Sequence, residues 1–137
     1  MILNILSNFT DLRIVFWNYR KLILILLLHG LTGSLRYWKR GLQYAPEEST
    51  ILAIDLLGFG DSPKPKSKYD IAEHLDAIEK VLQLEGFDKG GTLIVAHSLG
   101  TILSMALAGK HPNWFDELAL IGLPNYNEKN RINKRYT

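Results

Sequence analysis

Short apolar runs alternate along the chain with segments in which apolar residues recur every three or four positions. The uninterrupted runs cover residues 22–28, 51–57, 92–96 and 118–123. Runs of this length are typical of strands that are covered on both faces and therefore see no water. We predict four buried strands, preceded by an earlier strand at 13–18 that pairs at an edge of the sheet.

Helical periodicity is clearest in residues 69–84. One stripe of this segment is apolar, as in a helix that packs one face on a core, and consists of Ile71, Leu75, Ile78 and Leu82. Asp70 suits the N-cap, Glu73 follows it as in a capping box, and Gly86 is a suitable stop. His74 lies on the same segment, and we expect it to be half exposed.

Two further segments have helical character. Residues 99–110 predict a helix that ends before Pro112, since proline cannot continue it, and residues 35–45 predict a shorter helix that Gly41 weakens. Three aromatic residues of the second segment are expected to pack against the sheet rather than line a pocket: Tyr37, Trp38 and Tyr44. The alternation of strands and helices predicts an α/β protein with a mostly parallel sheet and helices on both faces.

Length and composition fit one globular domain. The chain has 137 residues, 47% apolar and 22% charged, and we expect residues 1–137 to form a single partial domain with a core at 13–124 and a polar tail at 125–137. The net charge of +2 gives no reason to expect a nucleic-acid partner, and the absence of cysteine excludes disulfides and thiolate metal sites. Without a signal peptide or a run of roughly 20 apolar residues, no membrane span and a cytoplasmic location are expected.

Residues capable of chemistry gather where the predicted strands end. The three motifs are His29-Gly30-Leu31, Gly58-Phe59-Gly60-Asp61-Ser62 and His97-Ser98-Leu99-Gly100. Ligands of an open parallel sheet bind beyond the carboxyl ends of its strands, so we predict that these motifs share one edge. Asp55, Asp61 and Ser62 are expected to fix a turn through Asx-type hydrogen bonds rather than to act as acids or bases.

Ser98 joins a predicted strand directly to a predicted helix. A serine on so tight a turn is held in a strained conformation, with its hydroxyl directed into the crevice. Small residues are needed two positions before and two after it, and Ala96 and Gly100 meet this requirement. The amides of Leu31 and Leu99 are suited to form an oxyanion hole. The simpler alternative is that Ser98 only caps the helix.

In combination and order, the motifs resemble the α/β-hydrolase family of esterases, lipases and thioesterases. The matching stretches are LLLHGLTGS at 26–34, IDLLGFGDS at 54–62 and VAHSLG at 95–100. Glycine is more common in this family where Ala96 stands. The serine at position 98 argues against the epoxide-hydrolase and dehalogenase branches, which use aspartate there.

This resemblance implies a role for each motif residue. Ser98 would be the nucleophile, the Leu31 and Leu99 amides would form the oxyanion hole, and the strand before Ser98 would lie beside the strand at 22–28. The residues that support the turns would be His29, Gly30, His97 and Gly100. A small acyl-type substrate such as an ester or thioester is implied, with no metal or organic cofactor.

The acid and the histidine of a catalytic triad are absent from the expected positions. In this family they follow the serine along the chain, whereas here Glu128 is the only acid after Pro124 and no histidine follows. None of the four histidines, His29, His74, His97 and His111, is placed to activate the serine by the family's geometry. We therefore interpret the chain as a truncated α/β-hydrolase fold that lacks the C-terminal strands, the acid and the histidine, and whether it is an enzyme alone stays open.

Two other interpretations belong to different functional classes: a non-catalytic binding protein that keeps the crevice, and an inactive truncated fragment. The last predicted strand, 118–123, would be an exposed apolar edge, and such edges recruit other chains. We expect self-association, or pairing with a complementing C-terminal chain, through that strand.

Overall fold

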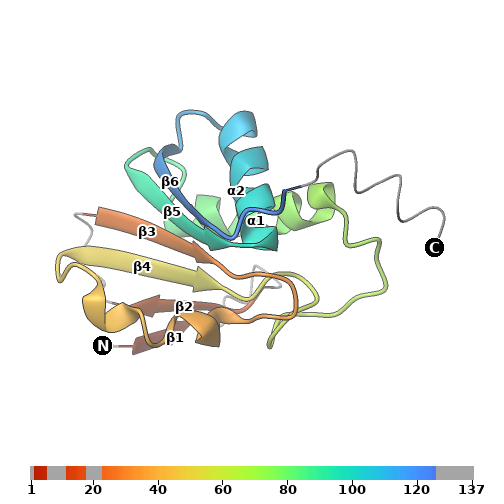
Figure 1. Ribbon diagram of the computed structural model, residues 1–137, viewed down its shortest axis with the longest axis horizontal. Helices are drawn as coiled ribbons and strands as arrows, with labels where there is room; N and C mark the ends of the chain where they lie inside the picture. The colour runs from red at the N-terminus through yellow and green to blue at the C-terminus, as the bar shows by residue number, and fades with distance from the viewer. Residues whose placement is uncertain (1, 6–11, 18–22, 126–137) are drawn as a thin grey trace.

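The computed structural model describes residues 2–5, 12–17 and 23–125, which form one six-stranded sheet with helices against it (Figure 1). The strands are β1 (Ile2–Ile5), β2 (Ile14–Trp17), β3 (Ile23–Leu28), β4 (Ser49–Ile54), β5 (Thr92–His97) and β6 (Phe115–Ile121). Their spatial order is β1-β2-β4-β3-β5-β6. The last four in that order are mutually parallel, and β1 and β2 pair antiparallel at one side. The predicted fold class is confirmed.

The register brings three strand ends to the same level. Leu28 at the end of β3 pairs with Ile54 at the end of β4 and with Ala96 near the end of β5. The chain leaves the sheet immediately after these positions, so all three motifs start at one edge, as predicted. The strand before Ser98 was predicted to lie beside the strand at 22–28. This prediction is confirmed, because β5 pairs with β3.

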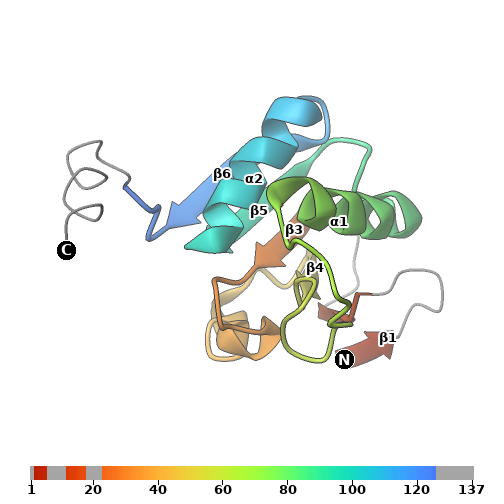
Figure 2. The same ribbon diagram turned by 90° about the vertical axis from the view of Figure 1, so that its right-hand side faces the viewer.

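Helices α1 (Ile71–Glu85) and α2 (Leu99–Lys110) cover one face of the sheet, and two 3-10 helices, η1 (Leu35–Trp38) and η2 (Leu42–Tyr44), lie on the other (Figure 2). The single helix predicted for 35–45 is wrong. Gly41 caps the second short helix, and the chain turns between the two. Neither α1 nor α2 has both the length and the apolar character that crossing a membrane requires.

Strand β3 and residues 51–54 of β4 are apolar because their side chains alternate between two cores. The larger core lies between the sheet and the helices α1 and α2, and includes Leu26, Leu28, Leu52 and Ile54. The smaller core lies under η1 and includes Ile25, Leu27, Ile51, Ala53 and Trp38. A strand buried on both faces has no position that favours a polar side chain, which explains the uninterrupted runs in the sequence.

The outer strand β6 is only half covered. Its burial alternates between partly buried and exposed positions, and Ile121 is exposed. No described strand pairs with its outer edge. Association of another chain through β6 stays a prediction, and the basic stretch at 129–135 lies outside the described residues.

Helix α1 has the predicted caps but a rotated buried face. The Asp70 side chain accepts a hydrogen bond from the Glu73 amide (3.0 Å), and Gly86 ends the helix in a left-handed conformation. The buried side chains are His74, Leu75, Ile78, Val81 and Leu82, whereas Ile71 is exposed.

The expectation of a half-exposed His74 is therefore wrong. The loop after β4 covers it, because its ring lies against those of Phe59 and Tyr69.

Burial lowers the pKa of His74, mainly because desolvation penalises the imidazolium form. The side chain is 2% exposed and its Nδ1 has no hydrogen-bond partner among the described residues. A charged ring would thus be forced into an apolar site. The unfolded chain, in which the pKa is about 6.5, binds this proton more readily than the folded chain.

The neutral His74 therefore contributes stability above pH 6.5 that is lost as the pH falls below that value. When the pH is lowered from about 7.5 to about 5, we expect the free energy of unfolding to fall less in His74→Leu than in the parent. Urea unfolding followed by circular dichroism at both pH values measures the difference. Equal losses in both proteins would contradict the prediction.

Candidate active site

Ser98 occupies a strained turn between β5 and α2. Its backbone angles are φ 49° and ψ −112°, a combination that an L-residue adopts at a cost of about 1–3 kcal/mol. The side chain makes no capping hydrogen bond to the helix that it precedes. Ser98 is the N-cap residue of α2 by position, but it caps the helix through its carbonyl oxygen and not through its side chain.

Gly100 allows the helix after Ser98 to approach the sheet. A Cβ at position 100 would lie 2.4 Å from the Leu28 carbonyl oxygen and 2.9 Å from that of His29. Both contacts are with backbone at the end of β3, which cannot move aside cheaply. The close approach of α2 to β3 thus explains why a small residue is needed two positions after the serine.

The turn after β3 packs directly on Ser98. The Gly33 amide donates a hydrogen bond to the Gly30 carbonyl oxygen (3.0 Å), and Thr32 has a positive φ of 60°. A Cβ at Gly30 would lie 3.0 Å from the Ser98 Cβ and 2.8 Å from the His97 Nδ1. Leu31 follows at the top of this turn. Among the described residues, neither its amide nor that of Leu99 has a hydrogen-bond acceptor.

His29 locks this turn to the next strand end. Its Nε2 accepts a hydrogen bond from the Leu56 amide (2.9 Å), so its Nδ1 carries the proton and donates to the Gly30 carbonyl oxygen (2.8 Å). The ring is fully buried, and burial lowers its pKa although the Gly30 bond and the Asp55 charge oppose the shift. Both ring nitrogens are thereby engaged. His29 holds backbone in place, as the motif predicted, and is not free to act as a base.

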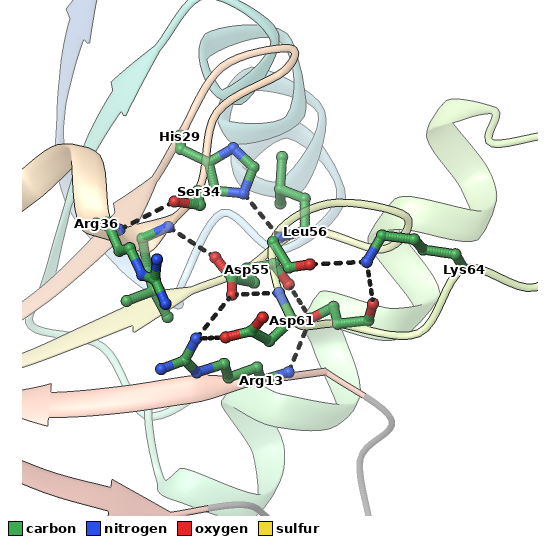
Figure 3. A network of polar contacts seen from close by, with 11 residues as sticks. Arg13, His29, Ser34, Arg36, Asp55, Leu56, Asp61 and Lys64 are labelled. Carbon is green, nitrogen blue, oxygen red and sulfur yellow. Dashed lines mark hydrogen bonds and ion pairs between the residues drawn. The ribbon is translucent and has the colours of Figure 1, made fainter.

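A buried carboxylate joins the remaining loops at this edge (Figure 3). Asp55 Oδ1 accepts a hydrogen bond from the Leu35 amide (2.7 Å), and Oδ2 accepts one from the Asp61 amide (2.9 Å). The side chain is almost completely inaccessible, and a Cβ at Gly60 would lie 2.3 Å from it. The carboxylate therefore fixes both the start of η1 and the loop after β4.

Arg13, immediately before β2, contributes the counter-charge. Arg13 Nη1 contacts the Asp61 carboxylate and lies 3.8 Å from Asp55 Oδ2. Ser62 Oγ accepts a hydrogen bond from the Arg13 amide (2.8 Å) and donates one to the Asp55 carbonyl oxygen (2.6 Å). The predicted turn-fixing role of Asp55 and Ser62 is confirmed. The part played by Arg13 was missed, because nothing in its local sequence indicates a partner 42 positions later.

His97 is held by an aromatic contact that the sequence did not reveal. Its ring stacks on that of Tyr37 in η1, with centroids 5.1 Å apart and planes 18° apart. Tyr37 and Tyr44 are 55% and 83% exposed, so the prediction that they pack against the sheet is wrong for both, although Trp38 is buried. In the two short helices only Leu35 and Trp38 are buried, whereas one continuous helix would have packed more of its side chains against the sheet.

None of the four histidines forms a hydrogen bond with the Ser98 hydroxyl, and His97 stacks on Tyr37 instead. His111 Nε2 bonds to Glu79 (3.0 Å) and its ring stacks on Trp114, at the far end of the 12-residue helix α2, about 18 Å along the axis. His74 is enclosed by aromatic rings. Within the described ranges, no side chain forms a hydrogen bond with the Ser98 hydroxyl.

Comparisons with known proteins identify the family. The family model described as alpha/beta hydrolase fold matches residues 23–136. The "Probable lysophospholipase BODYGUARD 4" of Arabidopsis thaliana is 38% identical over 109 residues, which cover 74% of this chain and 25% of that protein. The thioesterase domain from the curacin biosynthetic pathway has a TM-score of 0.76 at 25% identity, covering 98% of this chain and 51% of the other.

Haloalkane dehalogenase DbeA from Bradyrhizobium elkani has a TM-score of 0.80 at 20% identity, over 98% of this chain and 49% of the dehalogenase chain. At that identity the likeness is one of fold alone. The chain belongs to the alpha/beta hydrolase fold family, so the resemblance drawn from its motifs is confirmed. It spans about a quarter of the length of the curated relative that it matches.

The Asp55 carboxylate uses both oxygens as acceptors, so an amide in its place would set an NH₂ group against a backbone N–H. We expect Asp55→Asn to lower the free energy of unfolding by at least about 2 kcal/mol, since a buried donor loses its acceptor and Arg13 loses a counter-charge. Urea unfolding at pH 7.5 measures the loss. Asp61→Asn is the matched control: this side chain is 59% exposed, and a loss below about 1 kcal/mol is expected.

The two glycines of α2 give a second prediction. Gly100→Ala is expected to destabilise the protein by about 2 kcal/mol or more, because its Cβ meets the backbone of β3. Gly109→Ala, in the same helix, meets nothing within 4 Å and is expected to stabilise it by about 0.5–1 kcal/mol. Thermal unfolding of both variants tests the pair. Similar shifts in the two midpoints would show that close approach to β3 is not the constraint at position 100.

Proposed function

We propose that the chain supplies the nucleophile and the oxyanion hole of a serine hydrolase that cleaves an ester, thioester or related acyl bond. Ser98 is the nucleophile of this proposal, and the backbone amides of Leu31 and Leu99 are the oxyanion donors. The observation that carries it is the strained Ser98 backbone between β5 and α2, with Gly30 packed against the serine Cβ.

Strain of this kind needs a reason, because a relaxed turn would connect the same strand and helix at lower cost. Three separate features maintain it: the Gly100 contact with β3, the turn at Gly30, and the bond from the Ser98 amide to the Ile121 carbonyl oxygen (3.0 Å). The same geometry places the amide of Leu99 at the start of α2. The positive end of a helix dipole favours negative charge there, as an oxyanion requires.

In the proposed reaction, the Ser98 Oγ forms a bond to the acyl carbon while its proton passes to a base. The carbonyl oxygen becomes an oxyanion between the amides of Leu31 and Leu99, and its collapse releases the alcohol or thiol. Water then attacks the acyl-enzyme and releases the acid. The base and its partner acid come from outside the described residues, either from further sequence or from a second chain, because no described histidine forms a hydrogen bond with the Ser98 hydroxyl.

The acyl portion of the substrate is proposed to be apolar. Two exposed apolar side chains, Leu31 and Ile121, belong to segments that touch Ser98. The name of the Arabidopsis relative, a probable lysophospholipase, fits a long acyl chain. The non-catalytic alternative predicts binding of such acyl compounds without any reaction at Ser98.

The test is labelling of the 137-residue chain with a fluorophosphonate, read by intact mass with folding checked by circular dichroism. We expect one slow addition, faster in added imidazole, which stands in for the missing base. An oxyanion hole without a base retains about 10³–10⁴-fold acceleration over water in related enzymes.

Two variants locate the reaction. Ser98→Ala is expected to abolish the addition, whereas Ser104→Ala, which removes a buried serine of the same helix, is expected to retain it. A folded parent that stays unlabelled in imidazole, or one labelled equally at several serines, would refute Ser98 as the nucleophile.

A further inference from the structure

One surface beside the edge that carries Ser98 combines exposed cations with exposed apolar and aromatic side chains. It is formed by the turn after β3 and by η1 and η2, on the sheet face opposite α1 and α2 (Figure 2). We call it the η surface, and its members are Leu31, Arg36, Tyr37, Lys39, Arg40 and Tyr44. All six are exposed, and Leu31 and Tyr44 most of all, at 64% and 83%.

The charge of the η surface is uncompensated. Its three cations form no ion pair among the described residues, and the same holds for Lys64, Lys66, Lys68 and Lys80. Between positions 12 and 46 the sequence contains no aspartate or glutamate. Arg36, Lys39 and Arg40 lie within five residues of the chain, whereas the first acids that follow, Glu47 and Glu48, are exposed beyond η2. Such a group of cations attracts an anionic partner.

The apolar members of this surface face outward instead of packing. Tyr44 lies beside an apolar hollow of about 250 Å³, which is bounded by Ile25, Leu27, Trp38, Leu42 and Val95. Tyrosine carries an apolar ring with a polar tip, which suits a position where one end is apolar and the other is wet. Cations beside such side chains match the composition of protein surfaces that lie at a lipid interface.

We propose that the η surface binds an anionic lipid surface. Arg36, Lys39 and Arg40 contact the lipid phosphates, and the rings of Tyr37 and Tyr44 enter the headgroup layer. Charge favours a polyanion in general, and the exposed rings with the adjoining hollow favour a lipid over a nucleic acid, because a lipid surface alone offers an apolar layer beneath its charge.

Binding in this way would direct the edge that carries Ser98 toward the lipid. Tyr37 stacks on His97, the neighbour of Ser98, and Leu31 belongs to the turn that packs on the serine. The lipid contact nevertheless depends on none of the chemistry proposed for Ser98. Ser98→Ala is therefore expected to bind lipid as the parent does, and a failure of one proposal leaves the other testable.

The experiment is sedimentation of the 137-residue chain with vesicles of mixed phosphatidylglycerol and phosphatidylcholine, compared with vesicles of phosphatidylcholine alone. We expect binding to the anionic vesicles that weakens as salt is raised. The triple variant Arg36→Gln/Lys39→Gln/Arg40→Gln is expected to bind at least about tenfold more weakly. A triple variant of matched charge, Lys66→Gln/Lys68→Gln/Lys80→Gln, removes exposed lysines elsewhere and is expected to bind nearly as the parent does.

Tyr44→Ser tests the lipid-specific part, with Leu84→Ser, an exposed apolar residue of α1, as its control. We expect Tyr44→Ser alone to weaken binding several-fold. Equal loss in the two triple variants, or unchanged binding of the Arg36 triple variant, would assign any binding to net charge or to the basic stretch at 129–135 and overturn the proposal. Unchanged binding of Tyr44→Ser would show that the η surface binds polyanions in general, and would overturn the lipid assignment.

Discussion

At the end of β4, one buried carboxylate receives hydrogen bonds from two loops that are far apart along the chain. Asp55 accepts hydrogen bonds from the amides of Leu35 and Asp61, and Arg13, immediately before β2, approaches it. A carboxylate out of water is tolerated only when its oxygens are satisfied. The loops must therefore keep these positions in the folded state, and this fixes the arrangement of the loops at the edge of the sheet.

The strained serine depends on that order. The start of η1 is held by Asp55, and the turn between β3 and η1 is held by His29, whose two ring nitrogens are bonded to backbone. Gly30 in this turn packs on Ser98, while Gly100 brings α2 against the end of β3. Local strain of about 1–3 kcal/mol at one residue persists only because these surrounding contacts determine its conformation.

The two buried histidines, His29 and His74, differ in their hydrogen bonding. His29 and His74 are both neutral because burial disfavours the imidazolium form. One nevertheless links two loops through both nitrogens, and the other lies among aromatic rings with Nδ1 unpartnered. Neither reaches Ser98. The base of the reaction proposed above would therefore come from outside the described residues.

The sequence alone determined the parallel strands, the positions of α1 and α2, the caps of α1, and the convergence of three motifs, because periodicity, capping residues and glycines act over a few neighbouring positions. It misjudged the exposure of His74 and Tyr37, and it missed Arg13. Those features depend on which loop covers which helix and on a partner many residues away. Only the tertiary structure decided them, because burial and long-range pairing are properties of the packed chain and leave no periodic mark on the sequence.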